Sequence, residues 1–250
     1  MNKSPFQTGT PEAVLWEFLS YPLNTADDIL GRFASLPGAI HKKCGHKQAF
    51  VYVPGTRADA ATLIAHADTV FMEGEHKMRY DDTNTTISSG QADVGIGADD
   101  RAGCAMLWLF KDSGHNLLVF DGEECGQKGA RYLVTNFPDI LKEIQQSSFM
   151  IEFDRRGAND YKVYSIPVTK EFVDYIENET GYTEPDKRSV TDICVLCTDG
   201  CCGVNLSVSY YNEHLPSEEI IVNGWLHNYE VMQKMLAKPL KKYILKDKTP

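Results

Sequence analysis

Apolar side chains recur at helical spacing in two stretches near the N-terminus. In TPEAVLWEFLSYPL, Thr10 is a suitable N-cap and Pro11 suits the first helical position, so we expect a helix from 11 to about 20. A second helix is expected over 25–36, with Thr25 as its cap. The chain is therefore predicted to begin with two short helices.

The pattern then changes to short apolar runs bounded by turn residues. AFVYV (49–53) and TLIAHAD (62–68) are typical of strands. The segment 69–97 is polar and has no clear period. A loop of that length is uncommon inside a compact domain, so this segment is either a functional loop or contains a small hairpin.

Strands and helices alternate along the rest of the chain. The expected helices are 99–113, 125–137, 169–179 and 222–238, and the expected strands are 115–120, 148–154, 161–166, 192–197 and 203–211. Such alternation predicts an α/β domain of three layers, in which a central, mixed and mostly parallel sheet carries helices on both faces. Because no repeat or linker divides the sequence, we expect one domain over 1–250.

Composition limits the partners of this chain. Its 250 residues carry a formal net charge of −10, which argues against nucleic acid and anionic membranes, because both attract basic surfaces. No window approaches the ~20 apolar residues of a membrane helix, and no apolar stretch of signal-peptide length lies near residue 1. We interpret the lysine-rich KPLKKYILKDK near the C-terminus as a solvated tail.

The cysteines indicate a reducing compartment. There are seven, an odd number in a chain too large to need disulfides, so we expect reduced thiols and a cytoplasmic location. CVLCTDGCC (194–202) resembles a zinc knuckle, but a knuckle takes further ligands from a second cluster, and no other CxxC or HxxxH occurs. Thiols packed in a buried strand are the better interpretation.

Several expected strands end in residues with metal-binding chemistry. The ends are LIAHAD, LLVFDGEE, FMIEFD and NLSVSYYNEH, with His66, Asp68, Glu123, Glu124, Asp154 and His214, while Asp99 and Asp100 open the helix after the polar segment. Taken singly, such a histidine is more often structural, and such an aspartate is usually a helix cap. In open α/β sheets, however, ligands bind beyond the carboxyl ends of the strands, so these side chains can meet.

The combination of ligands indicates the kind of metal site. Imidazole and carboxylate without thiolate suit zinc, manganese or cobalt. A metal-bound histidine usually passes its other N–H to a carboxylate, and Asp68 lies two residues from His66 on the same strand face. Two histidines and three carboxylates exceed the needs of one tetrahedral zinc ion and suit two ions ~3.5–4 Å apart that share a carboxylate and a water. Adjacent glutamates can then divide ligation from proton transfer.

Five motifs in one order resemble a known superfamily. HAD, GADDRAG, DGEECGQKGA, EFD and NEH are similar to the motifs of the co-catalytic zinc exopeptidases, which include bacterial leucyl aminopeptidase, peptidase T and the glutamate carboxypeptidases. The match runs from about His66 to His214. The resemblance implies a zinc-exopeptidase fold of the phosphorylase/hydrolase-like kind and an enzyme, a metal-dependent hydrolase of peptide or amide bonds.

The resemblance also implies five metal ligands. Asp99 would bridge two divalent metal ions, most simply zinc, with manganese or cobalt as alternatives. His66 and Asp154 would complete one site, and Glu124 and His214 would complete the other.

Two further residues receive catalytic roles from the same resemblance. Glu123 would be the general base that takes a proton from the water shared by the two metals, and Asp68 would orient His66. Members of the superfamily usually have a cis peptide bond after the bridging aspartate, so we expect one between Asp99 and Asp100.

The spacing of the last two ligands distinguishes this chain from some relatives. Peptidase T and the carboxypeptidases insert a lid or dimerisation domain between the last carboxylate ligand and the final histidine. Here 59 residues separate Asp154 from His214, and they already contain expected strands and a helix. The chain therefore resembles the single-domain aminopeptidases, which also share an aspartate at the position of Asp154.

These features favour an aminopeptidase that removes N-terminal residues from short peptides. Two alternatives stay open. One is a dipeptidase or N-acyl amino acid amidohydrolase (deacylase) on the same fold, and the other is a non-catalytic binding homologue. Aminopeptidases of this kind are often homo-oligomers, although no exposed apolar stripe in the sequence identifies an interface.

Other polar residues have two interpretations each. Four can line a substrate pocket or pack structurally: Asp192, Asn205, Tyr210 and Tyr211. Three arginines next to predicted ligands can contact a substrate carboxylate or offset acidic charge: Arg101, Arg155 and Arg156. Five histidines without motif context are expected to be structural: His41, His46, His76, His115 and His227.

Overall fold

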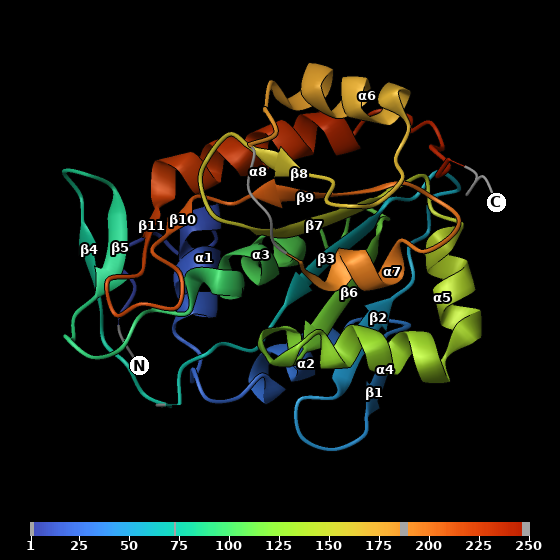
Figure 1. The fold of residues 1–250 in the computed structure, drawn as a ribbon. Helices are drawn as coiled ribbons and strands as arrows, with labels where there is room; N and C mark the ends of the chain where they lie inside the picture. Colours follow the sequence, from blue (N-terminus) through green and yellow to red (C-terminus); the bar gives the residue numbers. More distant parts are fainter. Residues whose placement is uncertain (1–2, 73, 186–189, 247–250) are drawn as a thin grey trace.

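A seven-stranded mixed sheet forms the centre of the protein (Figure 1). The computed structural model describes residues 3–72, 74–185 and 190–246. The strand order is β1 (Ile40–Lys43), β2 (Ala49–Val53), β6 (Asn116–Asp121), β3 (Thr62–His66), β7 (Met150–Arg155), β9 (Gly203–Ser207) and β8 (Tyr161–Lys162). The four inner strands β6, β3, β7 and β9 are parallel, and β1, β2 and β8 pair antiparallel at the two sides.

Burial explains why the inner strands read as continuous apolar runs. Every residue of β2, β3, β6 and β9 is buried, because helices cover both faces of the sheet. Because β3, β6 and β7 run parallel, they end at one edge of the sheet. The predicted polar residues lie at or just beyond these ends: His66 is the last residue of β3, Asp154 is the second-last residue of β7, and Glu123 and Glu124 follow β6. This edge holds the candidate site.

Helices lie on both sides of the sheet, as the alternation predicted. They are α1 (Pro11–Leu19), α2 (Asp27–Ala34), α3 (Ala98–Leu109), α4 (Lys128–Asn136), α5 (Pro138–Gln145), α6 (Lys170–Thr180), α7 (Asp192–Leu196) and α8 (Val222–Leu236), with a 3₁₀ turn η1 at Glu123–Cys125. The helices α1, α2, α3 and α8 pack on one side, whereas α4, α5 and α7 pack on the other. No helix in the described ranges is long and apolar enough to cross a membrane.

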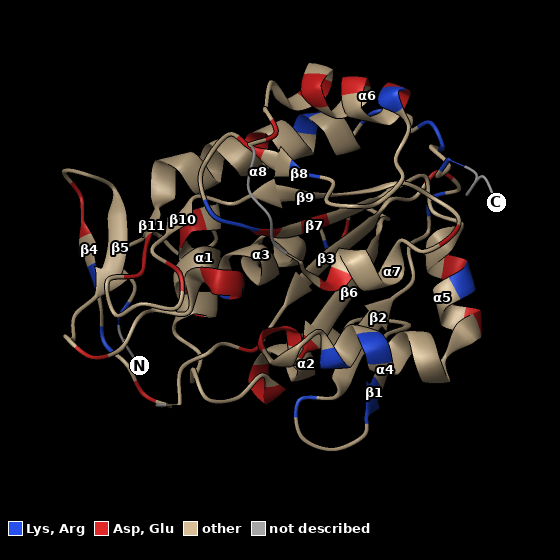
Figure 2. Ribbon diagram, in the orientation of Figure 1, with Lys and Arg blue, Asp and Glu red and all other residues tan. Residues whose placement is uncertain are grey.

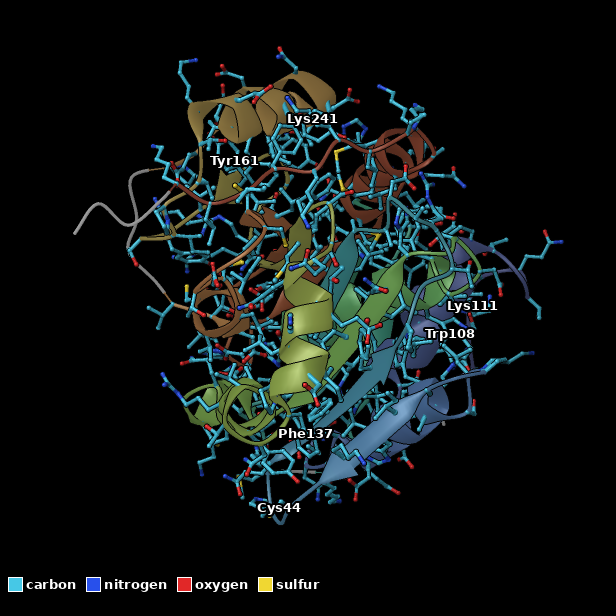
Figure 3. The ribbon with its side chains drawn as sticks, turned by 90° about the vertical axis from the view of Figure 1, so that its right-hand side faces the viewer. Cys44, Trp108, Lys111, Phe137, Tyr161 and Lys241 are labelled. Carbon is cyan, nitrogen blue, oxygen red and sulfur yellow. The ribbon has the colours of Figure 1, made fainter. Side chains whose placement is uncertain are left out.

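Aromatic contacts join the first three helices. The rings of Phe33 and Trp108 meet edge to face with centroids 5.4 Å apart, and Phe18 lies 6.2 Å from Trp108. Nζ of Lys111 lies over the indole of Trp108, 5.6 Å from the ring centroid; both residues are labelled in Figure 3. Thr10 caps α1 as predicted, because its hydroxyl accepts the amide of Ala13.

The polar segment 69–97 contains a hairpin, the second of the two alternatives. Its strands β4 (Met78–Asp81) and β5 (Thr86–Ser89) join β11 (Glu219–Ile221) and β10 (Tyr210–Tyr211) in a separate four-stranded antiparallel sheet. This small sheet lies at one end of the molecule, next to α1 (Figure 1). It connects the segment before α3 with the segment that carries His214.

Several boundaries differ from the predictions. The prediction of a strand over 192–197 is wrong, because residues 192–196 form the helix α7. The carboxylate of Glu152 accepts the amide of Ile193 and the hydroxyl of Thr191, so a buried acceptor at the helix start overrides a short apolar run that is ambiguous by itself. Of the cysteines from 194 to 202, the thiols at 197, 201 and 202 are buried, but none lies in a regular strand: Cys197 follows α7 in a turn, Cys201 forms an isolated β-bridge with Ile244, and Cys202 directly precedes β9.

Smaller differences concern the ends and number of elements. The cap of α2 is Ala26 rather than Thr25, whose hydroxyl accepts the amide of Asp27. The strand expected over 161–166 is only two residues long, the one over 203–211 is divided into β9 and β10, and the helix over 125–137 begins at Lys128. The elements β1, α5 and β11 were not predicted.

Candidate metal centre

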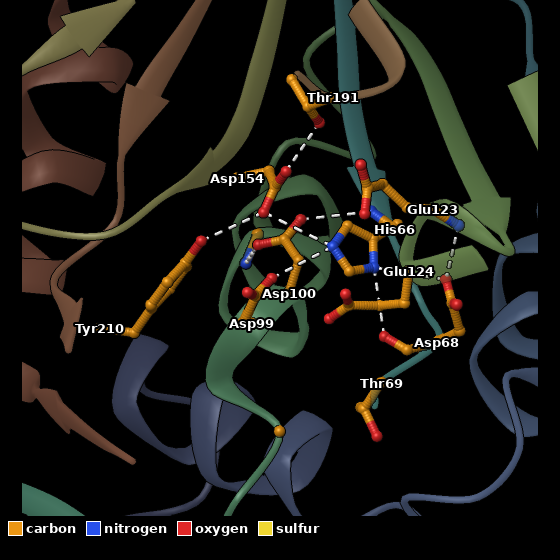
Figure 4. Close-up of polar contacts among 12 residues, drawn as sticks. His66, Asp68, Thr69, Asp99, Asp100, Glu123, Glu124, Asp154, Thr191 and Tyr210 are labelled. Atoms are coloured by element: carbon orange, nitrogen blue, oxygen red, sulfur yellow. Dashed lines mark hydrogen bonds and ion pairs between the residues drawn. The ribbon is translucent and has the colours of Figure 1, made fainter. Parts of the chain in front are cut away.

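Acidic and imidazole side chains from five segments meet beyond the carboxyl ends of the parallel strands. Figure 2 shows acidic residues at the start of α3 and in the turn between β6 and α4. In the close-up, His66 at the end of β3 lies among the carboxylates of Asp99, Asp154 and the two adjacent glutamates (Figure 4). The structure thus brings together side chains that lie far apart in the sequence, as expected from an α/β sheet.

The first group of potential ligands consists of His66, Asp99 and Asp154. Their nearest ligand atoms lie within 4.8 Å of one another. Nε2 of His66 is 3.1 Å from Oδ1 of Asp99 and 3.5 Å from Oδ1 of Asp154. Ligands held ~2.0–2.2 Å from one tetrahedral zinc ion are separated by roughly 3.3–3.5 Å, so this spacing fits a single ion.

The second group consists of Asp99, Glu124 and His214. Nε2 of His214 is 3.2 Å from Oδ2 of Asp99 and 2.8 Å from Oε1 of Glu124. Asp99 therefore directs one carboxylate oxygen to each group. This is the arrangement that a carboxylate shared by two ions requires.

The chemistry of the donors fits metal ions. Oε1 of Glu124 is buried and has no hydrogen bond of good geometry in the described part of the chain, although His214 lies beside it. Burial disfavours the charged form of His66, but the carboxylates of Asp154, Asp68 and Asp99 outweigh burial and raise its pKa well above the usual value. The carboxylates of Asp99 and Glu124, both close to Nε2, raise the pKa of His214 to about 11. The cluster has a strong demand for positive charge, which divalent ions would satisfy.

The backbone at the start of α3 holds Asp99 in place. The peptide bond between Asp99 and Asp100 is cis, which confirms the prediction. The buried carboxylate of Asp100 accepts the amides of His66 and Gly103, so it ties the end of β3 to α3. The carboxylate of Glu218 accepts the amides of residues 96, 97 and 99. Two buried carboxylates thus fix the main chain on either side of the shared aspartate.

Asp68 contacts the far nitrogen of the His66 ring. Nδ1 of His66 lies 3.1 Å from the carbonyl oxygen of Asp68 and 3.4 Å from its Oδ1. The carboxylate of Asp68 also accepts the amide of Glu123 and faces Nζ of Lys47 at 3.4 Å. Both acceptors favour a proton on Nδ1, which leaves Nε2 available as a ligand.

Glu123 lies at the wall of the same cavity. It is half-buried in η1, and its Oε1 accepts a hydrogen bond of 3.0 Å from Gln127. Burial, with smaller contributions from Asp154 and Glu124, raises its pKa to about 7. A carboxylate with a pKa near neutrality is suited to accept and return a proton at physiological pH.

The remaining polar candidates divide clearly. Of the four pocket candidates, Tyr210 lines the cavity and donates to Oδ1 of Asp154, whereas Asp192, Asn205 and Tyr211 do not line it. Asn205 is buried and bonds the amide and carbonyl of Asp154. Both carboxylate oxygens of Asp192 are buried without a partner among the described residues, and burial raises its pKa well above the usual value. The residue type alone therefore did not distinguish the polar residues that line the cavity from those that do not.

The arginines also differ in position. The guanidinium of Arg101 is buried and donates to the carbonyls of Tyr21, Pro22 and Thr25, so its role is structural. Arg155 and Arg156 line the cavity. Among the histidines without motif context, His76 and His115 bond backbone carbonyls, whereas His46 lines a separate small cavity.

Residues that the sequence did not single out support the predicted ligands. Thr191 donates to Oδ2 of Asp154 and to Glu152, Lys47 faces Asp68, and Glu218 holds the start of α3. No local motif marks these residues, because each acts through a partner more than 20 positions away in the chain. Their roles emerge only from tertiary contacts.

Comparison with known proteins agrees with this architecture. The sequence matches no protein-family model and no curated protein. Aminopeptidase PepT from Bacillus cereus has a similar structure, with a TM-score of 0.67 at 14% identity over 91% of this chain and 98% of that one. A tripeptidase from Staphylococcus aureus has a TM-score of 0.66 at 14% identity over 91% of this chain and 97% of that one. The TET1 peptidase from Pyrococcus horikoshii has a TM-score of 0.63 at 13% identity over 92% of this chain and 100% of that one. This chain therefore shares the fold of these peptidase structures, a mixed sheet with helices on both sides.

Proposed function

We propose that this protein is a metal-dependent exopeptidase, and specifically an aminopeptidase that hydrolyses the N-terminal bond of short peptides. One observation carries the proposal. Two groups of potential ligands share Asp99, and four of their five residues line the same cavity of about 170 Å³ as Glu123: Asp99, Glu124, Asp154 and His214. The names of the similar structures, an aminopeptidase, a tripeptidase and a peptidase, support the same class of reaction.

The proposal assigns five residues to two divalent ions. His66 and Asp154 would hold one ion, Glu124 and His214 would hold the other, and Asp99 would bind both. Such a pair, when bound, supplies Lewis acidity and lowers the pKa of water towards neutrality. Zinc suits these imidazole and carboxylate donors, as do manganese and cobalt.

Glu123 is proposed as the group that moves the proton. It accepts a proton from the attacking water and delivers that proton to the leaving amine, which its position in the cavity wall and its pKa of about 7 support. Asp68 is proposed to hold the ring of His66 through Nδ1. Gln127 limits the orientations of the Glu123 carboxylate.

The proposal extends to assembly and location. We infer that the protein forms homo-oligomers, since the similar TET1 peptidase assembles into a tetrahedron or a large octahedral shell. We infer a cytoplasmic location from the odd number of cysteines in the sequence. Gel filtration with light scattering of the purified protein tests the assembly.

Metal content and peptide cleavage together test the proposal. Elemental analysis of the purified protein should find close to two divalent ions per chain, and Glu124→Ala should lose at least one. The wild type should release amino acids from free peptides but not from N-acylated ones, whereas the alternative, an N-acyl amino acid amidohydrolase, has the opposite preference.

The proton-transfer role has its own variant. Glu123→Gln should lower kcat by roughly 10²–10⁴ while metal content stays unchanged. Glu230→Gln, the same change at an exposed position of α8, is the matched control. Absence of metal-dependent cleavage across a panel of free and blocked peptides would refute the enzymatic proposal.

A further inference from the structure

Two consecutive arginines follow the ligand Asp154 and line the candidate cavity. Arg155 is the last residue of β7 and Arg156 begins the loop that follows, and the cavity they line also contains five acidic residues. The side chain of Arg155 is only 7% exposed, and its Nε is 2.7 Å from Asp160. This guanidinium is already neutralised by a partner in its own loop, so it is not free to receive a ligand.

Arg156 is in a different situation. Its side chain is 48% exposed, and its Nη1 pairs with Oε1 of Glu213, the residue directly before His214. Within the ranges that the structure describes, this is the polar contact of Arg156, and it engages one nitrogen of the three. A planar guanidinium can present two parallel N–H groups to a carboxylate, so Arg156, which lines the cavity, keeps donors available for a ligand there.

We propose that Arg156 binds the free α-carboxylate of a short peptide and that Glu213 occupies this position when no substrate is present. The inference rests on the proposed peptidase function, since it names the substrate class of the same site. The Arg156 side of the pair is 48% exposed and the Glu213 side is 20% exposed. Ion pairs that water reaches contribute little to stability, about 0–1 kcal/mol, so a substrate carboxylate can replace Glu213 on Arg156. A two-pronged contact in the cavity would more than replace the single one.

The size of the cavity determines the substrate class that this contact selects. Its volume is about 170 Å³, below the ~300–1,000 Å³ of clefts that hold drug-sized ligands. Arg156 lines this small space together with Asp99, Glu124, Asp154 and His214, so a carboxylate bound to Arg156 lies within one or two residues of the reacting amide. The preferred substrates are therefore dipeptides and tripeptides with a free C-terminus.

The two partners of the ion pair should have opposite effects, which separates recognition from a structural tether. Removal of Arg156 eliminates the receptor for the carboxylate. Removal of the charge on Glu213 eliminates a competitor of that carboxylate. A pair that merely joined the loops carrying Asp154 and His214 would give parallel losses in both variants.

Equilibrium binding tests the proposal without requiring turnover. The probes are a dipeptide analogue in which CH₂–NH replaces the amide, used as the free acid and as the C-terminal carboxamide, with the zinc-loaded protein in a calorimeter. We expect the wild type to bind the acid at least tenfold more tightly than the carboxamide. Arg156→Gln should bring that ratio close to one, and Glu213→Gln should raise it about threefold.

Controls keep the outcomes distinct. Arg79→Gln removes an exposed arginine of β4, whose Nε donates to Ser88, and should leave the ratio unchanged. Arg156→Lys keeps the charge without the two-pronged geometry and should give an intermediate ratio, which also covers the case in which Arg156→Gln does not fold.

Two results would overturn the inference: equal affinity of the wild type for acid and carboxamide, or parallel losses in the two ion-pair variants. If the acid preference depends on Arg156 but no peptide is cleaved, the peptidase proposal fails while this inference stands. If peptides are cleaved but the ratio of acid to carboxamide affinity is the same with and without Arg156, the peptidase proposal stands and this inference fails.

Discussion

Gly103, the last residue of the motif GADDRAG, allows α3 to approach β7 closely. A Cβ atom at this position would lie 2.3 Å from the carbonyl oxygen of Phe153 and 2.4 Å from Oδ2 of Asp100. Both neighbours are fixed, since one is strand backbone and the other is a buried carboxylate that accepts two backbone amides. Gly103→Ala therefore tests how strictly the packing of this helix positions Asp99.

The magnitude follows from the overlap. A carbon and a carbonyl oxygen approach no closer than ~3.3 Å in favourable contacts, so α3 must move by about 1 Å. Residues 98–107 are all buried, and interiors resist such a shift. Overpacking typically costs about 1–3 kcal/mol, and a clash with backbone belongs at the upper end. For a domain of this size, 3 kcal/mol corresponds to a Tm lower by about 6–12 °C.

The loss of metal should exceed the loss of stability. Asp99 lies on α3 and Asp154 on β7, so a shift of about 1 Å changes the distance between two proposed ligands of one ion. Misplacement by ~1 Å can cost 10²-fold in function even when the fold persists. Thermal unfolding, elemental analysis after dialysis and peptide cleavage measure the three effects separately.

Gly31→Ala is the matched control. Gly31 lies on α2, and an added Cβ would meet no atom within 4 Å. Because alanine favours helices by up to ~1 kcal/mol over glycine, this variant should be as stable as the wild type or slightly more stable. The reasoning about α3 would be refuted if Gly103→Ala unfolded at the wild-type temperature and retained its metal.

Three further predictions concern residues that are not proposed ligands. Lys47→Met removes the cation that faces Asp68, and we expect metal affinity to fall by roughly tenfold in a chelator titration, with partial recovery in Lys47→Arg. Burial lowers the pKa of His115, whose Nδ1 accepts the amide of Ala61. The unfolded state therefore takes up a proton first as pH falls below ~6.5, and this residue removes up to ~1.4 kcal/mol of stability per pH unit. Urea unfolding at several pH values should therefore show stability falling less steeply below pH ~6.5 in His115→Gln than in the wild type. Glu218→Gln should destabilise the protein by about 2 kcal/mol and reduce metal retention, with Glu219→Gln as control, and equal unfolding midpoints for the two variants would contradict it.

The sequence predicted the fold well where hydrophobic period and chain topology agree. The parallel strands were recognisable because burial on both faces leaves unbroken apolar runs. The run at 192–197 was misassigned, since five apolar or small residues fit a strand and a helix equally well until the contact with Glu152 is known. The strands β10 and β11 are too short to have a period of their own.

The five proposed ligands were recognisable for a related reason. Each lies at a strand end or a helix start, where polar residues contrast with the adjoining apolar run. Glu218 and Lys47 lack such contrast, because they lie in polar segments and act on residues that only folding brings near. The local sequence pattern thus predicts polar residues that border the core. Residues that support them through tertiary contacts are identified only from the structure.

The short segment from His214 to Glu218 does two things at once. At one end its imidazole faces Asp99, and at the other its buried carboxylate holds the amide of the same aspartate. A displacement of these five residues would therefore withdraw one candidate ligand and release the support of another together. Local unfolding of residues 214–218 would therefore release both proposed metal ions together rather than one after the other.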